Sequence, residues 1–212
     1  NFASPIVEQR ENNLVMVREQ MELASDLETS VVKIFAAWPG VTLDKNGIGT
    51  YDMAWKYLTS PYYMDVTLLE QWNWCVEGIK EAAKWAEEYG ITLALQNHPP
   101  ILRYGYEDAL VMVKEIGADN VKLCLDVTLL DKQNDEYIAE AVQRCKDLIV
   151  HSHYHSGEFR ETPTGEIIID PAWWLPGRPY LNYRAFIREL KTIGYNGFFA
   201  NEECAPVLVN HR

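Results

Sequence analysis

Five short apolar runs recur along the chain and constrain its fold more than any other feature of the sequence. Each run is continuous and lacks the alternation of apolar and polar residues that a half-exposed strand shows. This pattern is typical of strands buried on both faces of a parallel sheet. The runs begin at Val31, Ile91, Val121, Leu148 and Gly197. Because segments with helical patterns separate them, the sequence predicts βα units and a parallel sheet.

Helix signals in the intervening segments support this interpretation. Thr67 and Glu70 have the spacing of a capping box, and Gly90 is of the residue type favoured just past a helix C-terminus. A helix is therefore expected between Thr67 and Gly90. Further helices are expected at about 8–27, 106–117, 134–146 and 182–193. The segment from 39 to 64 is predicted to be a long functional loop.

The last four apolar runs each end in a polar residue that could carry chemistry. These residues are Gln96, Asp126, His153 and Glu202. In a (β/α) barrel the carboxyl ends of the parallel strands meet at one face, where the active site is built. The sequence therefore predicts that these four side chains lie together at the C-terminal edge of the sheet.

This set of residues suits a metal ion. Oxygen ligands with one imidazole fit a hard or borderline divalent cation, with Mn²⁺ as the first expectation and Mg²⁺, Co²⁺ or Zn²⁺ as alternatives. Such an ion could polarise a substrate carbonyl while a nearby base removes the proton on the adjacent carbon. The candidate bases are Glu202 and His98. His98 precedes two prolines that stiffen its loop, so a purely structural role is equally open.

Neighbouring residues leave two assignments open. His151 and His153 are two residues apart in one run, so their side chains share a face of the strand and both could reach a metal. The alternative for His151 is a position deeper in the barrel, hydrogen-bonded to its neighbours. Glu202 and Glu203 are adjacent and point to opposite faces, so only one of them faces the site.

Charge and composition exclude several classes of partner. The formal net charge is −12 and the pI is about 4.8, which argues against a nucleic-acid surface and against an anionic membrane. Hydrophobic residues make up 48% of the 212 residues, enough for the core of one domain. The cysteines have no CxxC spacing and are expected to be reduced. Without a secretory segment or a long apolar span in the sequence, a cytoplasmic protein is expected.

The motifs at the strand tips resemble those of a known family. LALQNHPP, LCLDVTLL, LIVHSHYH and GFFANEE occur in the order, and with similar spacing, of four strand motifs of the xylose isomerase-like TIM barrels. This superfamily of sugar phosphate isomerases and epimerases includes ketose 3-epimerases, inosose dehydratases and enzymes of the endonuclease IV type. The resemblance covers nearly the whole chain and implies a TIM (β/α)8-type barrel. Residues 1–212 would form a single partial domain that corresponds to the last five βα units, with the N-terminal strands of the barrel absent.

The resemblance also implies roles for individual residues. The family's metal ligands correspond to Gln96, Asp126, His153 and Glu202. Arg160 corresponds to an arginine that contacts the substrate. Trp38 lies at the tip of the first strand, and His155 lies in the loop after the strand of His153. Both are further candidates for substrate contact, and His155 could also serve as a base. The aromatic residues of this face could stack on a sugar or an aglycone, or pack against a partner subunit or a missing piece of barrel.

Two departures from the family pattern bear on the reaction. Gln96 stands where the family usually has a glutamate, which in the epimerases is also one of two acid/base residues. An amide oxygen can coordinate a metal, but the amide cannot carry a proton back and forth. Leu129 stands where the family has a histidine after the aspartate motif. A two-base epimerisation therefore lacks one of its bases at these positions.

The sequence thus predicts a metal-dependent carbohydrate enzyme that enolises a keto-sugar, as an isomerase or epimerase. The alternative is a lyase that eliminates an aglycone or water from a keto-glycoside or keto-inositol, as in C-deglycosylase or dehydratase members, because elimination needs only one base. A non-catalytic barrel subunit is the third interpretation. The expected partner is a small sugar or glycoside, and assembly into a homo- or hetero-oligomer is left open. The charge of −12 disfavours a DNA-repair endonuclease.

Overall fold

Five parallel strands form the centre of the structure. The computed structural model describes residues 1–37, 65–154 and 181–202 in full, together with the backbone of four short strands between these ranges. The main sheet contains, in spatial order, β1 (Val31–Ile34), β4 (Thr92–Gln96), β5 (Val121–Asp126), β6 (Ile149–Tyr154) and β9 (Phe199–Asn201). Each neighbouring pair is parallel. The predicted parallel sheet of a partial TIM barrel is therefore confirmed.

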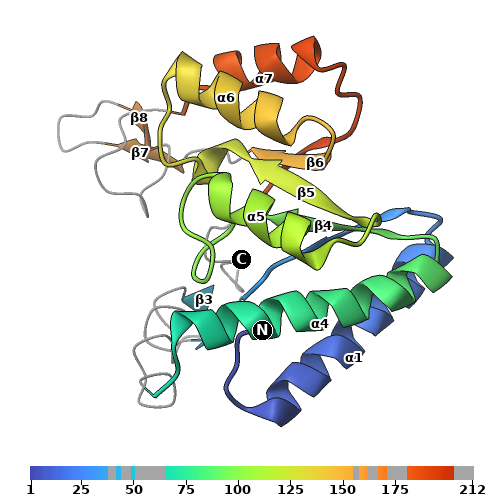
Figure 1. Cartoon of the computed structure of the whole chain (residues 1–212). Coiled ribbons are helices and arrows are strands. Elements are labelled where there is room, and N and C mark those ends of the chain that lie inside the picture. The colour runs from blue at the N-terminus through green and yellow to red at the C-terminus, as the bar shows by residue number, and fades with distance from the viewer. Residues whose placement is uncertain are drawn as a thin grey trace, which may run out of the picture.

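Helices alternate with these strands along the chain. They are α1 (Val7–Asp26), α4 (Leu68–Glu88), α5 (Glu107–Ile116), α6 (Asp135–Cys145) and α7 (Tyr183–Thr192). A short 3-10 helix, η1 (Val127–Leu129), follows β5 directly. Figure 1 shows α1 and α4 at one end of the array and α6 and α7 at the other, with α5 between them. The helices thus follow the order of the strands, as in half of a (β/α) barrel.

Local signals explain where α4 begins and ends. The Thr67 hydroxyl accepts a hydrogen bond from the Glu70 N–H at 3.2 Å, and the Glu70 carboxylate accepts one from the Thr67 N–H at 2.8 Å. Gly90, just past the helix, has a φ of 65°, which a residue with a Cβ rarely adopts. The predicted capping box and glycine stop are both confirmed.

Two short antiparallel pairs lie in segments that the sequence led us to expect as loops. β2 (Thr42–Leu43) pairs with β3 (Gly49–Thr50), and β7 (Glu158–Glu161) pairs with β8 (Ile167–Asp170). The sequence between β7 and β8 contains a proline and a glycine, the residues typical of a turn between paired strands.

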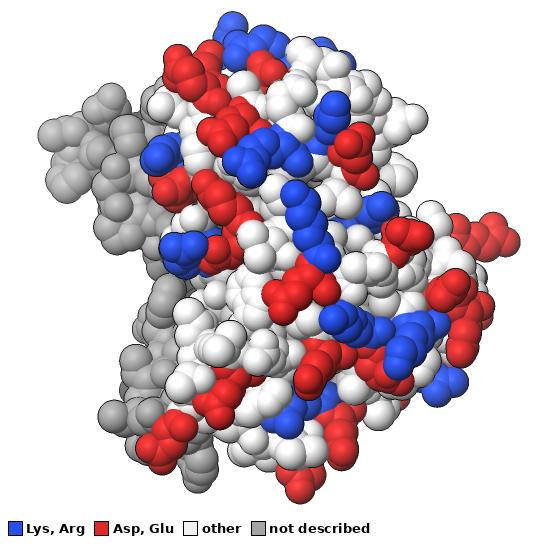
Figure 2. All heavy atoms as spheres, viewed as in Figure 1, with Lys and Arg blue, Asp and Glu red and all other residues white. Residues whose placement is uncertain are grey.

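The outer surface carries both signs of charge. Figure 2 shows acidic and basic side chains intermingled over the helices that face the viewer. The acidic excess of the chain is thus spread over solvated helix surface in this view. Among the described residues, none of the helices is both long enough and apolar enough to cross a membrane.

Asn97 joins the carboxyl ends of β4 and β5. Its Oδ1 accepts a hydrogen bond from the Asp126 N–H at 2.8 Å. Its Nδ2 donates to the carbonyl oxygens of Gly105, at 2.9 Å, and of Asp126, at 3.2 Å. Asn97 is buried, so water cannot replace these bonds without opening the structure. The amide therefore holds Asp126 in place relative to the tip of β4.

Asn97→Asp should destabilise the protein, and more so at neutral than at acidic pH. The new carboxyl would face two carbonyl oxygens, so its ionised form is disfavoured and its pKa is raised in the folded state. A raised pKa costs stability as pH rises from the unfolded value towards the folded one. We expect urea denaturation to show a loss of about 3 kcal/mol in the free energy of unfolding at pH 7.5. The loss should be smaller at pH 5.

The control for this substitution is Asn12→Asp on the exposed side of α1, which should leave stability nearly unchanged. An equal loss from Asn97→Asp at both pH values would contradict the assigned hydrogen bonds.

Phe2 packs against a glycine of α4. Its side chain is buried, and a Cβ placed on Gly78 would lie 2.5 Å from its ring. Contact this close is not tolerated, so the absence of a side chain at Gly78 makes room for Phe2. The residues before α1 are thereby fixed to the helical layer.

Gly78→Ala should lower stability although alanine is the better helix former. Alanine gains about 1 kcal/mol over glycine inside a helix, but overpacking costs about 1–3 kcal/mol. We expect thermal unfolding to show a net loss of about 1 kcal/mol. In a Phe2→Ala background the same change should instead gain about 1 kcal/mol. Stabilisation by Gly78→Ala in the otherwise unchanged protein would show that the close packing is absent.

Candidate metal centre and active site

The register of the sheet decides which side chains share its inner face. Gln96 pairs with Cys124, and Asp126 pairs with His153. Lys33 pairs with the residue two positions before Gln96. Paired residues of neighbouring strands share a face, and so do residues two apart in one strand. These side chains from β1, β4, β5 and β6 therefore all point to the same side.

A β-bulge in β6 determines which of its residues join this face. The register between β5 and β6 shifts by one residue after Leu123. A shift of one residue exchanges the two faces of a strand. As a result, His153 rather than Ser152 lies opposite Asp126. The Ser152 hydroxyl instead donates to the carbonyl oxygen of Leu125 at 2.8 Å.

The four polar residues at the strand tips meet around the amide of Gln96. The Gln96 Nε2 atom lies 2.8 Å from Asp126 Oδ2 and 2.8 Å from Glu202 Oε2. It also lies 3.3 Å from His153 Nδ1. His153 Nδ1 is in turn 3.1 Å from Glu202 Oε2. The structure thus brings together the four residues that the sequence singled out as ligands.

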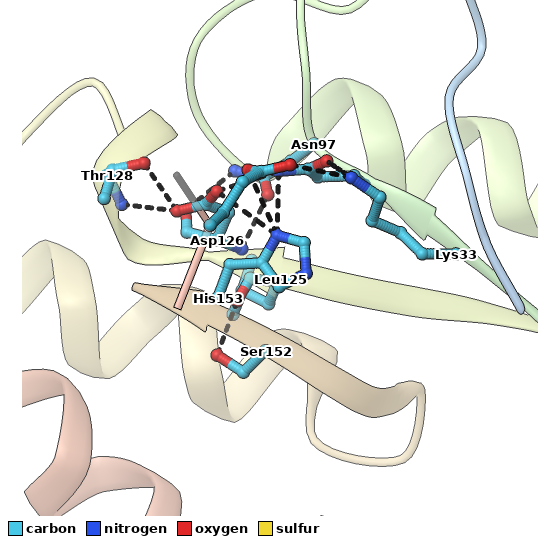
Figure 3. Close-up of polar contacts among 9 residues, drawn as sticks. Lys33, Asn97, Leu125, Asp126, Thr128, Ser152 and His153 are labelled. Atoms are coloured by element: carbon cyan, nitrogen blue, oxygen red, sulfur yellow. Dashed lines mark hydrogen bonds and ion pairs between the residues drawn. The ribbon is translucent and has the colours of Figure 1, made fainter. Parts of the chain in front are cut away.

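Lys33 belongs to the same cluster and was not among the residues singled out from the sequence. Its Nζ donates to Glu202 Oε1 at 2.7 Å and to Gln96 Oε1 at 3.1 Å. Figure 3 shows Lys33 reaching the cluster from the side opposite Thr128. The available signal was a charged residue inside the apolar run VVKIFAAW. A lysine in a strand buried on both faces needs a polar partner on one of them.

Thr128 fixes the carboxylate of Asp126 through two hydrogen bonds. Its backbone N–H and its hydroxyl both donate to Asp126 Oδ1, at 2.8 Å and 2.6 Å. The other oxygen, Oδ2, faces Gln96 and His153. Since Asp126 is 1% exposed, these contacts hold a buried charge in a single orientation.

The pKa values of the two carboxyls are shifted in opposite directions. Burial first, and then the charge of Glu202, raise the pKa of Asp126 above its usual range. Burial also works to raise the pKa of Glu202, but the hydrogen bond to His153 and the charge of Lys33 outweigh it and the pKa is lowered. The hydrogen bonds from Thr128 and the electrostatic effect of His153 lower this pKa by less than burial and Glu202 raise it, so Asp126 lacks a fully compensating charge. A cation between the two carboxylates would supply one.

Three of these residues fit a divalent ion. Asp126, His153 and Glu202 each offer one ligand atom, and these atoms lie within 4.8 Å of one another. Two carboxylates and one imidazole form a donor set that hard or borderline divalent ions accept. Gln96 presents its amide nitrogen to this group and its oxygen to Lys33, so its oxygen joins the donors only if the amide turns. The described part of the chain therefore contains a buried site that could hold a metal.

A second group shares His153 but suits a metal less well. Cys124, His151 and His153 also lie within the same limit of one another. Burial raises the pKa of the Cys124 thiol well above its usual range, whereas a cysteine binds metal as the thiolate. The ring of His151 packs edge-on against that of His153, with centroids 5.0 Å apart. Among the residues described, the carboxylate group is the better candidate.

The remaining candidates from the sequence lie around this centre or outside the described residues. His98 packs edge-on against Phe35, with ring centroids 5.1 Å apart. Burial lowers the pKa of His98; the charge of Glu202 opposes this shift and the charge of Lys33 adds to it. Arg160 lies in β7, of which the backbone alone is described. Trp38, His155 and Glu203 lie outside the described residues.

Two curated proteins share part of this sequence. An inosose isomerase of Bacillus velezensis is 26% identical over 132 residues, which cover 61% of this chain and 46% of the relative. An uncharacterised protein of Methanocaldococcus jannaschii is 26% identical over 130 residues, which cover 58% of this chain and 41% of the relative. The match thus spans less than half the length of both relatives.

Solved structures share the fold. A 3-keto-D-glucoside 4-epimerase from E. coli superimposes with a TM-score of 0.66 at 16% identity, over 95% of this chain and 66% of that chain. A D-psicose 3-epimerase, crystallised in the presence of D-fructose, gives a TM-score of 0.65 at 17% identity, over 95% of this chain and 59% of that chain. This chain therefore covers less than two thirds of these neighbours.

The family follows from a sequence comparison over almost the full length. The profile of the xylose isomerase-like TIM barrels matches residues 1–208. The parallel sheet, with its polar strand tips on one edge, is the architecture that this match requires. The chain therefore belongs to the xylose isomerase-like TIM barrel family.

Proposed function

We propose that this chain carries the active site of a metal-dependent carbohydrate enzyme that enolises a keto-sugar, of the isomerase or epimerase type. The observation that carries the proposal is the convergence of Asp126, His153 and Glu202 at the strand tips, with ligand atoms within 4.8 Å of one another. The relatives add support, since they include an inosose isomerase and two sugar epimerases. The substrate is a small sugar or glycoside.

In this proposal Asp126, His153 and Glu202 hold the ion, and Gln96 serves as the fourth ligand through its amide oxygen. Mn²⁺ is the first candidate among the ions that accept oxygen and nitrogen donors. When bound, the ion would polarise the keto oxygen and acidify the neighbouring C–H bond. Thr128 keeps Asp126 oriented for this role, because both of its donors bind the carboxylate oxygen that faces away from the cluster.

The chain offers two candidate bases for the proton on that carbon. Glu202 is ionised at neutral pH, the form that accepts a proton, and its lowered pKa makes it a weaker base than an ordinary glutamate. His98 has a lowered pKa as well and is therefore neutral at pH 7, so its imidazole can also accept one. We assign Arg160, Trp38 and His155 to substrate contacts, because a guanidinium could steady the negative charge that develops on the substrate.

Elimination is the second candidate reaction, and Gln96 is the observation that favours it. The Gln96 amide has no titratable proton, and Leu129, which stands in place of a family histidine, is buried in the core. A lyase acting on a keto-glycoside or keto-inositol needs one base, which this site offers, and a leaving group, which the substrate carries. A non-catalytic barrel subunit is the outcome if neither metal nor proton exchange is found.

We extend the proposal to the setting of the enzyme. Residues 1–212 act as one partial barrel domain. We place the protein in the cytoplasm. The described cysteines Cys75, Cys124 and Cys145 are buried and unpaired, in keeping with a reducing compartment.

Asp126→Ala should remove bound metal. Purified protein dialysed against Mn²⁺ is expected to hold one equivalent by elemental analysis, and the variant less than about a tenth of that, because a charged ligand is lost at the centre. Asp119→Ala, on the exposed loop before β5, is the matched control and should keep its metal. A protein that binds no metal in any of these forms would contradict the proposed centre.

Glu202→Gln should abolish most of the proton exchange. With Mn²⁺ present, a keto-sugar such as D-fructose or a 3-keto-glucoside is incubated in D₂O, and loss of the C–H signal next to the carbonyl is followed by proton NMR. We expect exchange that Glu202→Gln slows by at least about 100-fold. Exchange with retention of the sugar skeleton indicates isomerase or epimerase chemistry, whereas release of an aglycone indicates a lyase. Unchanged exchange in Glu202→Gln would assign the base to another residue, with His98→Gln as the next variant.

A further inference from the structure

Lys33 provides the metal centre with a positive charge of its own. Its Nζ lies 2.7 Å from Glu202 Oε1 and 3.1 Å from Gln96 Oε1. It also stands 4.0 Å from the centre of the Phe35 ring, a cation–π contact. The side chains of Lys33 and Glu202 are only 24% and 19% exposed. A pair this sheltered is screened far less than a surface pair.

Lys33 also fixes which way the Gln96 amide points. The amide oxygen faces the ammonium, while the amide nitrogen faces Asp126, Glu202 and His153. Turning the amide by half a rotation would place its N–H groups against the ammonium and its oxygen against the two carboxylates. Both contacts would be unfavourable, so the charges around Gln96 agree on the orientation seen. A metal ion would require the opposite orientation.

The positive charge of Lys33 also weakens the attraction of the site for a divalent ion. With both carboxylates ionised, Asp126 and Glu202 contribute two negative charges and Lys33 contributes one positive charge, which leaves a net charge of −1 for an ion of charge +2. A glutamate in place of Gln96, the residue usual for the family, would raise the negative charge by one. Close like charges in a sheltered site repel strongly. Lys33 and a divalent ion therefore compete for the same two partners, the Glu202 carboxylate and the Gln96 oxygen.

We propose that Lys33 is a resident cation that sets the metal affinity of this site, and that a divalent ion binds only by drawing Glu202 and the Gln96 oxygen away from it. This inference rests on the proposed metal centre and adds a residue that opposes it. The residue acts through its fixed charge and its hydrogen bonds. The expected consequence is a metal that is held weakly and exchanges readily, unlike an ion locked in a closed cage.

The test is a Mn²⁺ titration of the purified protein at pH 7.5, followed by the EPR signal of unbound Mn²⁺. Lys33→Met should lower the Kd for Mn²⁺ at least about tenfold, because a positive charge next to the ion is removed. Lys84→Met is the matched control. Lys84 and Glu81 form an ion pair of 2.6 Å on the surface of α4, where their side chains are 70% and 42% exposed. Removing the charge of Lys84 should leave the Kd for Mn²⁺ unchanged.

A second substitution tests the competition for Gln96. Gln96→Glu adds a carboxylate that Lys33 would neutralise, so it should tighten Mn²⁺ binding only slightly on its own. In the Lys33→Met background the same change should tighten binding much more. Such non-additivity is expected of residues that share a partner. Additive effects of the two changes would count against direct competition.

The outcomes separate this inference from the proposed function. If the unchanged protein binds Mn²⁺ and Lys33→Met binds it equally well or more weakly, Lys33 does not compete and the inference is wrong, while the metal centre stands. If neither form nor the double variant binds Mn²⁺, the metal centre itself is wrong. If Lys33→Met does not fold, Lys33→Gln removes the charge while keeping a donor for Glu202, and the same comparison applies.

Discussion

The register between β5 and β6 is the constraint on which the site depends. The one-residue shift after Leu123 turns His153 to the inner face and leaves it opposite Asp126. Without that shift the imidazole would point into the layer between sheet and helices, where Ile149 and Leu123 are packed. One extra residue in β6 thus decides whether Ser152 or His153 lies opposite Asp126, and bulges recur beside active sites because they re-aim side chains in this way.

Around this register the polar groups form one connected arrangement. Gln96 and Asp126 are almost fully buried, so each of their oxygen and nitrogen atoms needs a partner to offset lost hydration. Asn97 holds the backbone of Asp126, Thr128 holds one of its oxygens, and Gln96 binds the other. Among the described residues, these contacts fix the geometry of the cluster at the ends of the strands.

Much of this could be predicted from the sequence, and the missing parts have identifiable causes. Continuous apolar runs located the five strands, and their polar ends located Gln96, Asp126, His153 and Glu202. Lys33 was not predicted to join the site, because it lies inside its apolar run and not at the end of the run. The side on which a residue faces depends on pairing between strands, which a single sequence does not contain. The bulge in β6 and the orientation of the Gln96 amide belong to the same class, since both arise only when distant residues meet.

The ion pair between Lys33 and Glu202 has a geometric consequence for the sheet as a whole. Lys33 lies in β1, and Glu202 directly follows β9; these are the two outermost strands of the five. In a flat sheet the outermost strands would lie about 19 Å apart, from four spacings of about 4.8 Å each, which is beyond the reach of the two side chains. Their contact at 2.7 Å therefore shows that the sheet is strongly curved, and the ion pair connects its two outermost strands. The curvature of the sheet thus holds the polar cluster together, and any change that flattened the arc would separate Lys33 from Glu202.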